Sequence, residues 1–584
     1  MDAQITPRDL PAEPKPADDA VSAAPSEPTP SEAKAETPAP QGEAAPAQPP
    51  FVPMPRVRAA GYILASLVLA LSQGFGQSII SANLQQLQGG FSATQAETTW
   101  LAAAYLAPNV SLTLALIKIR AQYGLRNFAE LSILGFLLAA FLNYAANDIN
   151  SAIAVRFMSG MAAAPMTSLA FLYMLEPFPP QKKMSVGLSL ALTFIFIGPS
   201  FTSVVSPPLL DIGLWHGLTA LEVALAMVGF GLIYCLPLAP VPRAKVIKAA
   251  DIISYLLIAI GMGAAAVALT LGPLYWWREA AWIGWLLATA IVTITAAAII
   301  ELNREHPLLD IRWLASPAVL HFTAALLLFR LVLSEQSSGA AGLFRALGLL
   351  NDQTQTLFLV IMAATIAGGL ICAALMKPGR EKAFHVVALI LLIIGASMDA
   401  NATSATRPVN MYLSQTLIAL ASALFLPPAM LSGLMSALAR GREYLLSFVI
   451  VFLTTQKLGG ILGSAVFSTF ITLRRAFHAE RISEALSVTN PFVNERIAQL
   501  AAANRALSPD QMLTSAQGLS ILNSQVTTEA TVLAYNDAFL AIAFVSSLAL
   551  AALLGHIIID AVKSRRARLD ADATPAGAAT PQPA

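Results

Sequence analysis

Residues 252–271 read IISYLLIAIGMGAAAVALTL, a stretch without one charged side chain. A helix needs about twenty apolar residues to cross the hydrocarbon core of a bilayer, and this stretch has that length. It therefore predicts a membrane-spanning helix.

The composition of the whole chain agrees with that prediction. Of its 584 residues, 56% are hydrophobic and 12% are charged, whereas a soluble domain of this length would carry about twice that fraction of charge. The formal net charge is +1, which argues against nucleic acid as a partner. Lipid must therefore surround most of the chain.

Similar apolar stretches recur between two polar tails. They predict fourteen spans, at residues 58–80, 98–118, 128–146, 150–174, 184–206, 217–238, 250–271, 280–301, 317–337, 355–376, 384–400, 409–436, 444–471 and 536–562. The tails, 1–55 and 569–584, hold too few large apolar residues to offset the entropy of the chain, so we expect them to be disordered. We therefore expect an all-α polytopic membrane protein.

Basic residues fall in alternate connections between the predicted spans. The rich connections contain Lys118, Arg120 and Arg126; Lys182 and Lys183; Arg243, Lys245 and Lys248; Arg304 and Arg312; Lys377, Arg380 and Lys382; Arg440 and Arg442; and Lys563, Arg565, Arg566 and Arg568. Lys and Arg concentrate on the cytoplasmic side of membrane proteins. The alternation therefore predicts an even number of spans and two cytoplasmic termini.

The segment 474–534 is the longest polar connection, and the alternation places it on the external side. Ala, Leu and Ile recur at helical spacing in 476–486 and 494–506. We expect a short packed helical hairpin there. Disorder is the alternative, because connections of this length are usually either functional or disordered.

Five ionisable residues lie inside predicted spans and away from the span ends, where each costs several kcal/mol unless it is paired or faces water. They are Arg156, Glu222, Arg330, Glu335 and Lys457. Each is a candidate for the proton-coupling or substrate pathway. Arg330 and Glu335 share one span but, at five residues apart, lie on rather different faces of it, so each is expected to find another partner.

Two of these residues allow contrasting interpretations. Arg156 could orient a carboxylate or relay a proton, or it could extend to the outer interface as a snorkelling side chain. Burial raises the proton affinity of a carboxylate, so Glu222 could exchange a proton. It could instead be an interfacial residue that hydrogen-bonds to Thr219 or His216.

Small residues mark two possible moving parts. Gly459, Gly460 and Gly463 allow close helix packing in the thirteenth predicted span, and Gly198 with Pro199 interrupts the fifth. Interrupted or glycine-lined helices are where transporters place binding sites and hinges, although ordinary helix packing uses the same residues.

Enzyme and metal-site signatures are missing from the sequence. The six histidines are scattered without metal-ligand spacing, and neither a GxxxxGK[ST] loop nor a GxSxG elbow in a strand–helix context occurs. We therefore expect neither an enzyme nor a metal centre.

Several motifs carry a resemblance that runs from about residue 60 to residue 560. They are TTWLAAAYLAPNV with Trp100 and Tyr105, RFMSGMAAAP from Arg156, PFPPQKK with Lys182 and Lys183, ELNREHPLLDIRWLASPAVL from Glu301, QKLGGILGSA, and VTNPFVNERIAQL followed by VTTEATVLAYNDAFLAIA. In these stretches the chain resembles the fourteen-span drug:proton antiporters of the major facilitator superfamily, of the EmrB/QacA type.

The resemblance implies a major facilitator fold. It implies two six-helix bundles, at 56–240 and 317–562, and a central inserted helix pair at 250–301. It also implies alternating access and export of amphipathic compounds across the bacterial inner membrane, with the proton gradient as energy source and no cofactor. A periplasmic membrane-fusion adaptor and an outer-membrane channel would be partners, with segment 474–534 as a contact.

The chain departs from the family pattern at several positions. Gly76 and Gln77 lie around the place of the first-span Asp, and IKIRAQYGLRN keeps only Gly124, followed by Arg126, of the cytoplasmic loop motif. Gln456 replaces an Arg beside Lys457, and Glu222 replaces an Asn. One hypothesis is that Glu222 takes over proton coupling, with its charge near Arg156.

The sequence thus favours a proton-driven exporter of hydrophobic or aromatic compounds, with acidic compounds as one option. The cations Arg156, Arg330 and Lys457 suggest an anionic substrate, but they could equally be paired with Glu222 and Glu335. A narrow-substrate exporter of a metabolite or siderophore is one alternative. A non-transporting membrane scaffold or sensor is another.

Overall fold

The fold is all-helical in the residues that the computed structural model describes: 53–239, 247–304, 307, 310–441, 444–487, 489–502 and 511–573. Within these residues twelve helices are long and apolar enough to cross a membrane. They coincide with twelve of the fourteen predicted spans. Of the other two, 317–337 falls on a short helix followed by a π-helical turn, and 444–471 falls inside a longer helix. The chain is an all-α polytopic membrane protein, and the count of fourteen stays a prediction.

The first half of the chain forms one bundle. Its helices are α1 (Arg56–Ala82), α2 (Leu84–Phe91), α3 (Gln95–Tyr123), α4 (Leu125–Ala145), α5 (Ile149–Leu175), α6 (Pro180–Lys182), the π-turn η1 (Lys183–Gly187), α7 (Leu188–Phe196), α8 (Gly198–Gly213) and α9 (Trp215–Cys235). Helix α1 packs against α5, α8 and α9, while α5 also packs against α3 and α4.

The second half forms another bundle. It contains α12 (Ile311–Leu314), α13 (Pro317–Val332), the π-turn η2 (Glu335–Gly339), α14 (Ala340–Ala346), α15 (Asn351–Leu375), α16 (Glu381–Asp399), the 3₁₀ turn η3 (Pro408–Met411), α17 (Tyr412–Leu438), α18 (Tyr444–Ala485), α19 (Pro491–Ala502) and α20 (Gln511–Ala573). Helix α17 packs against α15 and α16, and α18 packs against α13 and α20.

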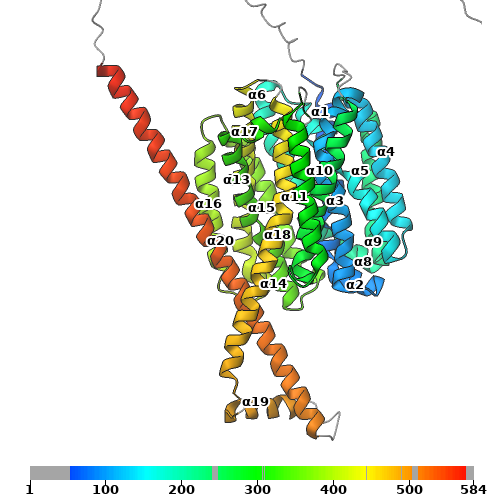
Figure 1. Cartoon of the computed structure of the whole chain (residues 1–584), viewed down its shortest axis with the longest axis vertical. Helices are drawn as coiled ribbons and strands as arrows, with labels where there is room; N and C mark the ends of the chain where they lie inside the picture. The colour runs from blue at the N-terminus through cyan, green and yellow to red at the C-terminus, as the bar shows by residue number, and fades with distance from the viewer. Residues whose placement is uncertain are drawn as a thin grey trace, which may run out of the picture. The chain divides into compact units, whose positions relative to one another are not determined.

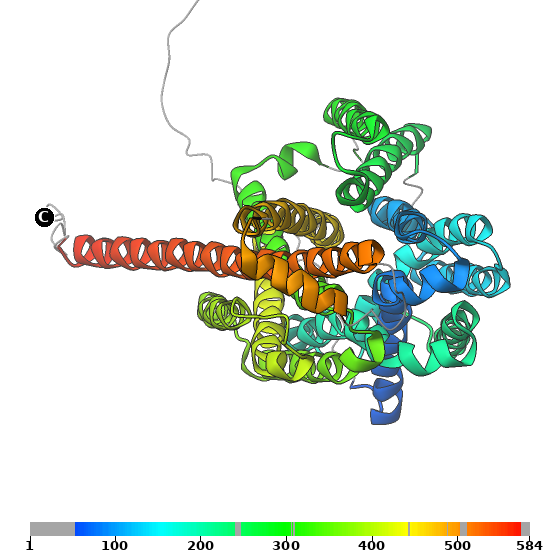
Figure 2. The ribbon, with the colours of Figure 1, turned by 90° about the horizontal axis from the view of Figure 1, so that it is seen from below.

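The inserted pair is central in the sequence but lies at the side of the fold. Helices α10 (Ala249–Tyr275) and α11 (Ala281–Leu302) pack against each other, and α10 contacts α3 and α18 (Figure 2). Asp251 at the start of α10 receives Lys118 Nζ at 2.7 Å and Arg304 Nη2 at 2.5 Å. These ion pairs attach one end of the two inserted helices to α3.

The two ends of the bundles differ. Helix α6 lies at one end, which we call the basic end, while α2, α14 and α19 lie at the other, which we call the hairpin end (Figure 1). The Lys118–Asp251–Arg304 cluster joins three connections that the sequence predicted on one side. Which end faces the cell interior stays a prediction.

The bundles meet along a seam, where α15 contacts α7 and α8 and α18 contacts α3. Near the hairpin end, Asn351 Nδ2 donates to Asn83 Oδ1 at 2.5 Å and Arg345 Nη2 donates to the Ser81 carbonyl at 2.8 Å. Both bonds join α1 or its C-cap to the second bundle. The seam is therefore closed at the hairpin end.

The predicted hairpin at 474–534 is helical but not separate from the spans. Helix α18 runs unbroken to Ala485, α19 follows, and α20 begins at Gln511 (Figure 1). Arg474 and His478 of α18 both bind Asp537 of α20 at 2.6 Å and thus join the two helices at the base of the hairpin. Residues 503–506 of the predicted helical stretch lie outside the described residues.

One predicted tail needs correction. Helix α20 continues to Ala573, so residues 569–573 of the predicted disordered tail 569–584 are helical, because the alanines, arginines and leucine of RRARLDADA favour helix. Residues 574–584 lie outside the described part of the chain, as do residues 1–52 of the other tail. Residues 53–55 precede α1.

The fifth predicted span is interrupted where Gly198 and Pro199 indicated. Helix α7 ends at Phe196 and α8 begins at Gly198. A Cβ atom on Gly198 would lie 2.7 Å from the Cα atom of Gly74 on α1. The two helices thus cross at a distance that only glycine permits.

Candidate functional site

A buried ion pair occupies the centre of the first bundle. Arg156 of α5 is 0% exposed and Glu222 of α9 is 1% exposed. Arg156 Nη1 lies 3.8 Å from Glu222 Oε1, which is too far for a hydrogen bond. Arg156 also donates to the carbonyl of Gly76 and lies over the ring of Tyr105, with its guanidinium carbon 4.4 Å from the ring centre. The sequence hypothesis placed these two charges near each other, and the structure brings them together.

The surroundings of the pair do not match the interfacial alternative for either residue. Asn143 of α4 donates to Glu222 Oε2 at 3.0 Å. His216 binds Asn147 instead, and Thr219 donates to the Trp215 carbonyl. Neither reaches Glu222, and Arg156 does not extend to an interface.

Arg330 faces the seam between the bundles. It lies on α13 of the second bundle, and its guanidinium carbon is 5.7 Å from the ring centre of Phe196 on α7 of the first. Its buried Nε atom has no hydrogen-bond partner among the described residues. A Cβ atom on Gly460 would lie 2.6 Å from Arg330 Nη2, so the glycine face of α18 provides the space that this side chain occupies.

The other two glycines of α18 line the same contact. Cβ atoms on Gly459 and Gly463 would each lie 3.1 Å from Arg330, from its Cβ atom and its carbonyl oxygen respectively. The small residues that the sequence marked for packing therefore serve to bring α18 onto the segment of α13 that carries Arg330.

Lys457 of α18 crosses the seam from the same bundle as Arg330. Its Nζ atom donates to Thr113 Oγ1 at 3.0 Å and to the carbonyl of Asn109 at 3.3 Å, both on α3. Asn109 Nδ2 in turn donates to the Gly160 carbonyl on α5 at 3.0 Å, one turn from Arg156. A polar chain thus leads from Lys457 toward the buried pair.

Neither seam cation has an acidic partner in the described part of the chain. The possible partners are engaged elsewhere: Glu222 faces Arg156, and Glu335 receives Gln415 Nε2 at 2.8 Å. The sequence left open whether the cations are paired with Glu222 and Glu335 or stay available to an anionic substrate. In the described residues Arg330 and Lys457 have no carboxylate within 4.0 Å.

Glu335 belongs to a polar cluster that sequence reasoning missed in part. Gln415 of α17 bridges it to Asp399, donating to Asp399 Oδ2 at 2.8 Å. The sequence does not single out Asp399, because it is the last residue of α16, where an acidic residue is usually solvated. It does not single out Gln415, because that residue is uncharged. The one sequence signal for this cluster is that Asp399 and Gln415 lie near the adjoining ends of two successive predicted spans.

The remaining predicted residues have local roles. Gln77 is half-buried and receives Gln73 Nε2 at 2.9 Å, next to Gly76 in the first span. Gly124 ends α3 with φ of +81°, a backbone conformation that favours glycine. Arg126 pairs with Glu130 one turn along its own helix at 2.8 Å, so within the described residues it makes no ion pair between helices.

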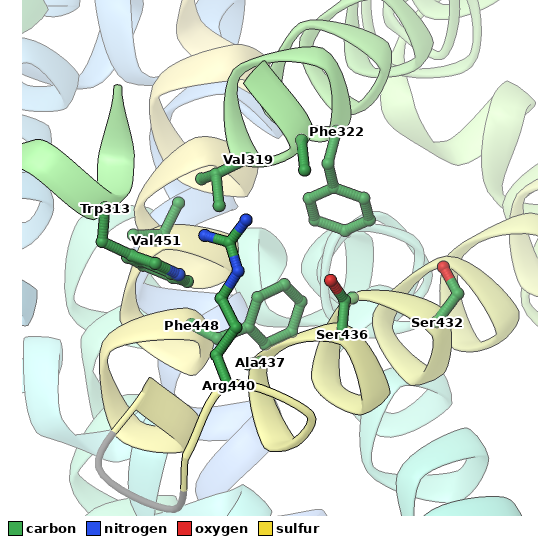
Figure 3. A pocket seen from close by; sticks show the side chains of 11 residues that line it. Trp313, Val319, Phe322, Ser432, Ser436, Ala437, Arg440, Phe448 and Val451 are labelled. Atoms are coloured by element: carbon green, nitrogen blue, oxygen red, sulfur yellow. The ribbon is translucent and has the colours of Figure 1, made fainter. Parts of the chain in front are cut away.

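A pocket of about 210 Å³ lies within the second bundle, apart from these residues. It is lined by residues of α12, α13, α17 and α18, and the Arg440 side chain projects into it beside Trp313 and Val319 (Figure 3). Sites for drug-sized ligands usually exceed about 300 Å³. The pocket is therefore too small to be the main substrate site.

Comparison with known proteins gives partial sequence matches. The chain is 23% identical to the multidrug export protein EmrB of Haemophilus influenzae over 265 residues, which cover 44% of this chain and 51% of that protein. It is also 23% identical to the fatty acid resistance protein FarB of Neisseria gonorrhoeae over 262 residues, covering 43% and 50%. The chain thus matches about half the length of each relative. No family model matches it.

The solved structures show the fold. The human organic anion transporter MFSD10 (TETRAN) superposes with a TM-score of 0.51 at 12% identity, covering 84% of this chain and 100% of that chain. The proteins found by these comparisons are named as transport or resistance proteins, not as enzymes. The chain is a membrane protein with the fold of the major facilitator superfamily, and its sequence resembles those of the EmrB-type antiporters within it.

Proposed function

We propose that this protein is a secondary transporter that exports amphipathic, aromatic and acidic compounds across the bacterial inner membrane, driven by the proton gradient. The observation that carries the proposal is the pair of seam cations, Arg330 and Lys457, which have no acidic partner in the described residues. Charges inside a membrane protein are costly and tend to mark substrate or ion pathways.

The seam offers the chemistry that such a substrate needs. Arg330 and Lys457 project from different helices of the second bundle toward α7 and α3 of the first. The aromatic ring of Phe196 lies beside Arg330 and can stack with an aromatic substrate. An anion with an aromatic or aliphatic body therefore fits these side chains better than a cation would.

The names of the relatives support this class of substrate. One is a multidrug export protein, one is a fatty acid resistance protein, and the fold neighbour is an organic anion transporter. A fatty acid is an amphipathic carboxylate, so an anion site at the seam is in keeping with that name.

For the first bundle we propose that Glu222 is the proton-coupling group. It is buried beside Arg156 without a hydrogen bond between them. A proton on Glu222 would weaken its attraction to Arg156. Gly160, one helical turn from Arg156 on α5, is joined through Asn109 to Lys457. Proton binding and substrate binding would thus act on the same helices, α3 and α5.

The hairpin formed by α18, α19 and α20 is the proposed contact for a periplasmic adaptor, which would connect the transporter to an outer-membrane channel. Its exposed apolar residues include Phe492, at 77% exposed, and Met512, at 81%. This assignment places the hairpin end outside the cytoplasm and both termini inside, as the basic connections predict.

Purified protein in proteoliposomes with an acidic lumen provides the test. A permanently charged aromatic sulfonate should accumulate inside, and a protonophore should abolish the accumulation. The matched uncharged sulfonamide should accumulate at least about tenfold less, because a lost charge-assisted hydrogen bond costs about 1.5 kcal/mol or more. A sulfonate avoids the passive redistribution of weak acids across a pH gradient.

Two outcomes would contradict the proposal. Accumulation of neither probe, with or without the gradient, would favour a scaffold or sensor. Equal accumulation of both probes would show that the seam cations do not select the substrate.

A further inference from the structure

The second bundle contains a break at the place where it carries Glu335. Helix α13 ends at Val332, the five residues Glu335–Gly339 form a π-turn, and α14 begins at Ala340. π-Helical turns inside helices occur frequently at functional sites. This turn directs Glu335 into the core of the bundle, where the residue is 0% exposed.

Two carboxylates meet there around one amide. Gln415 Nε2 donates to Glu335 Oε1 and to Asp399 Oδ2, each at 2.8 Å. Ser414 donates to Asp399 Oδ1. Asp399 is 3% exposed and Gln415 is 0% exposed. Three helical elements, η2, α16 and α17, thus converge on one pair of acids.

The cluster leaves hydrogen-bonding capacity unused. Glu335 Oε2 and Gln415 Oε1 are both buried and have no partner among the described residues. A protonated carboxyl group can donate a hydrogen bond where a carboxylate can only accept one, so a proton in the cluster would supply a donor that these oxygens lack.

The charged groups on the neighbouring elements do not compensate the pair. In the described chain no basic side chain lies within 4.0 Å of either carboxylate. Arg330 of α13 turns toward Phe196, and Arg345 of α14 turns toward Ser81. On α18 and α20, Arg474 and His478 bind Asp537, while the Tyr535 hydroxyl faces Gly342.

We propose that Glu335 and Asp399 form a proton-binding site in the second bundle, sharing one proton across the Gln415 bridge. Two adjacent buried carboxylates cannot both hold a negative charge without a cation, so one proton remains between them. The assignment of that proton to coupling rests on the proposed function, whereas its presence does not.

The position of the site connects proton loss to movement. Glu335 lies between Arg330, which faces the seam, and Arg345, which donates to Ser81 across the closed hairpin end. Loss of the proton would place two negative charges side by side and drive η2 away from α16 and α17. The π-turn joins both arginines, so a shift of the turn moves the substrate cation and the seam contact together.

Infrared difference spectroscopy on the full-length protein in lipid tests the proton directly. Between acidic and alkaline pH, the unaltered protein should lose a carbonyl-stretch band of a protonated carboxyl group. Glu335→Gln and Asp399→Asn should each remove the same part of that band, because the remaining single carboxylate can stay ionised with Gln415 as donor. Glu222→Gln should leave that part in place. Asp352→Asn, at an exposed acidic residue of α15 in the same bundle, is the matched control and should keep it.

Transport of the aromatic sulfonate then tests coupling. Both variants should lose at least about tenfold of the accumulation driven by an acidic lumen, yet keep exchange of labelled for unlabelled sulfonate without a gradient. Exchange shows that a variant is folded; if one variant fails to exchange, the other is used.

The outcomes separate the two claims. A band that is undiminished in both variants, or that is absent from the unaltered protein, overturns the shared proton. Variants that exchange and still accumulate sulfonate normally overturn its role in coupling. Failure of the unaltered protein to accumulate sulfonate contradicts the proposed function instead. The infrared measurement would still test the shared proton.

Discussion

Lys457→Gln is expected to weaken the apparent affinity for anionic substrates by about 10- to 100-fold, which follows from the loss of a charge-assisted hydrogen bond of about 1.5–3 kcal/mol. Lys457 is half-buried and has only neutral partners, Thr113 and the Asn109 carbonyl, in the described residues. A substrate anion can therefore replace these partners. Affinity is measured from the concentration dependence of sulfonate uptake in proteoliposomes.

The variant is compared with two others. Lys382→Gln removes an exposed lysine of α16 that pairs with Asp560, and affinity should be unchanged because exposed ion pairs contribute little. Arg330→Gln should weaken the affinity as Lys457→Gln does, because both side chains face the seam. Unchanged affinity in both seam variants would contradict the anion site.

Glu222→Gln is expected to reduce proton-driven transport at least about tenfold and to flatten its dependence on pH. The same change removes the only negative charge within 4.0 Å of Arg156 in the described structure. Leaving a buried charge without its partner costs about 3–5 kcal/mol, so the temperature of unfolding should also fall. Transport is followed over a series of lumenal pH values.

A double variant separates stability from coupling. Arg156→Gln with Glu222→Gln leaves neither charge unpaired, so much of the lost thermal stability should return, because removal of both partners costs less than removal of one. Transport should stay low, since no titrating group remains at this site of the first bundle. Glu222→Gln that transports normally, with the pH dependence of the unaltered protein, would rule out coupling by Glu222.

The sequence predicts the helices well because their signal is local. Apolar runs such as 252–271 identify spans by composition alone, and alternating basic connections indicate which helix ends lie together. Breaks also have local signals when Gly and Pro cause them, as at Gly198 and Pro199. The π-turn at Glu335–Gly339 has no such signal, because it depends on packing against α17, α18 and α20.

The site is harder to predict because it is built from contacts distant in sequence. Intramembrane cost singles out Arg156 and Glu222 one by one, and the family resemblance suggests their proximity. Neither the cost of burial nor the resemblance can show that Arg330 turns away from Glu335 toward Phe196. Nor does either reveal Asp399, whose burial depends on Ser414 and Gln415 of the next helix.

The central claim is that the seam between the two bundles, closed at the hairpin end, opens to pass an anionic substrate. Spin labels at Gln85 of α2 and Asp352 of α15, two exposed positions flanking the Asn83–Asn351 bond, report that opening when Cys235 and Cys372 are replaced. Pulsed electron resonance should show one short distance in the substrate-free protein and an added longer distance with aromatic sulfonate. A single unchanged distance in both conditions, for protein that binds the sulfonate, would contradict the account.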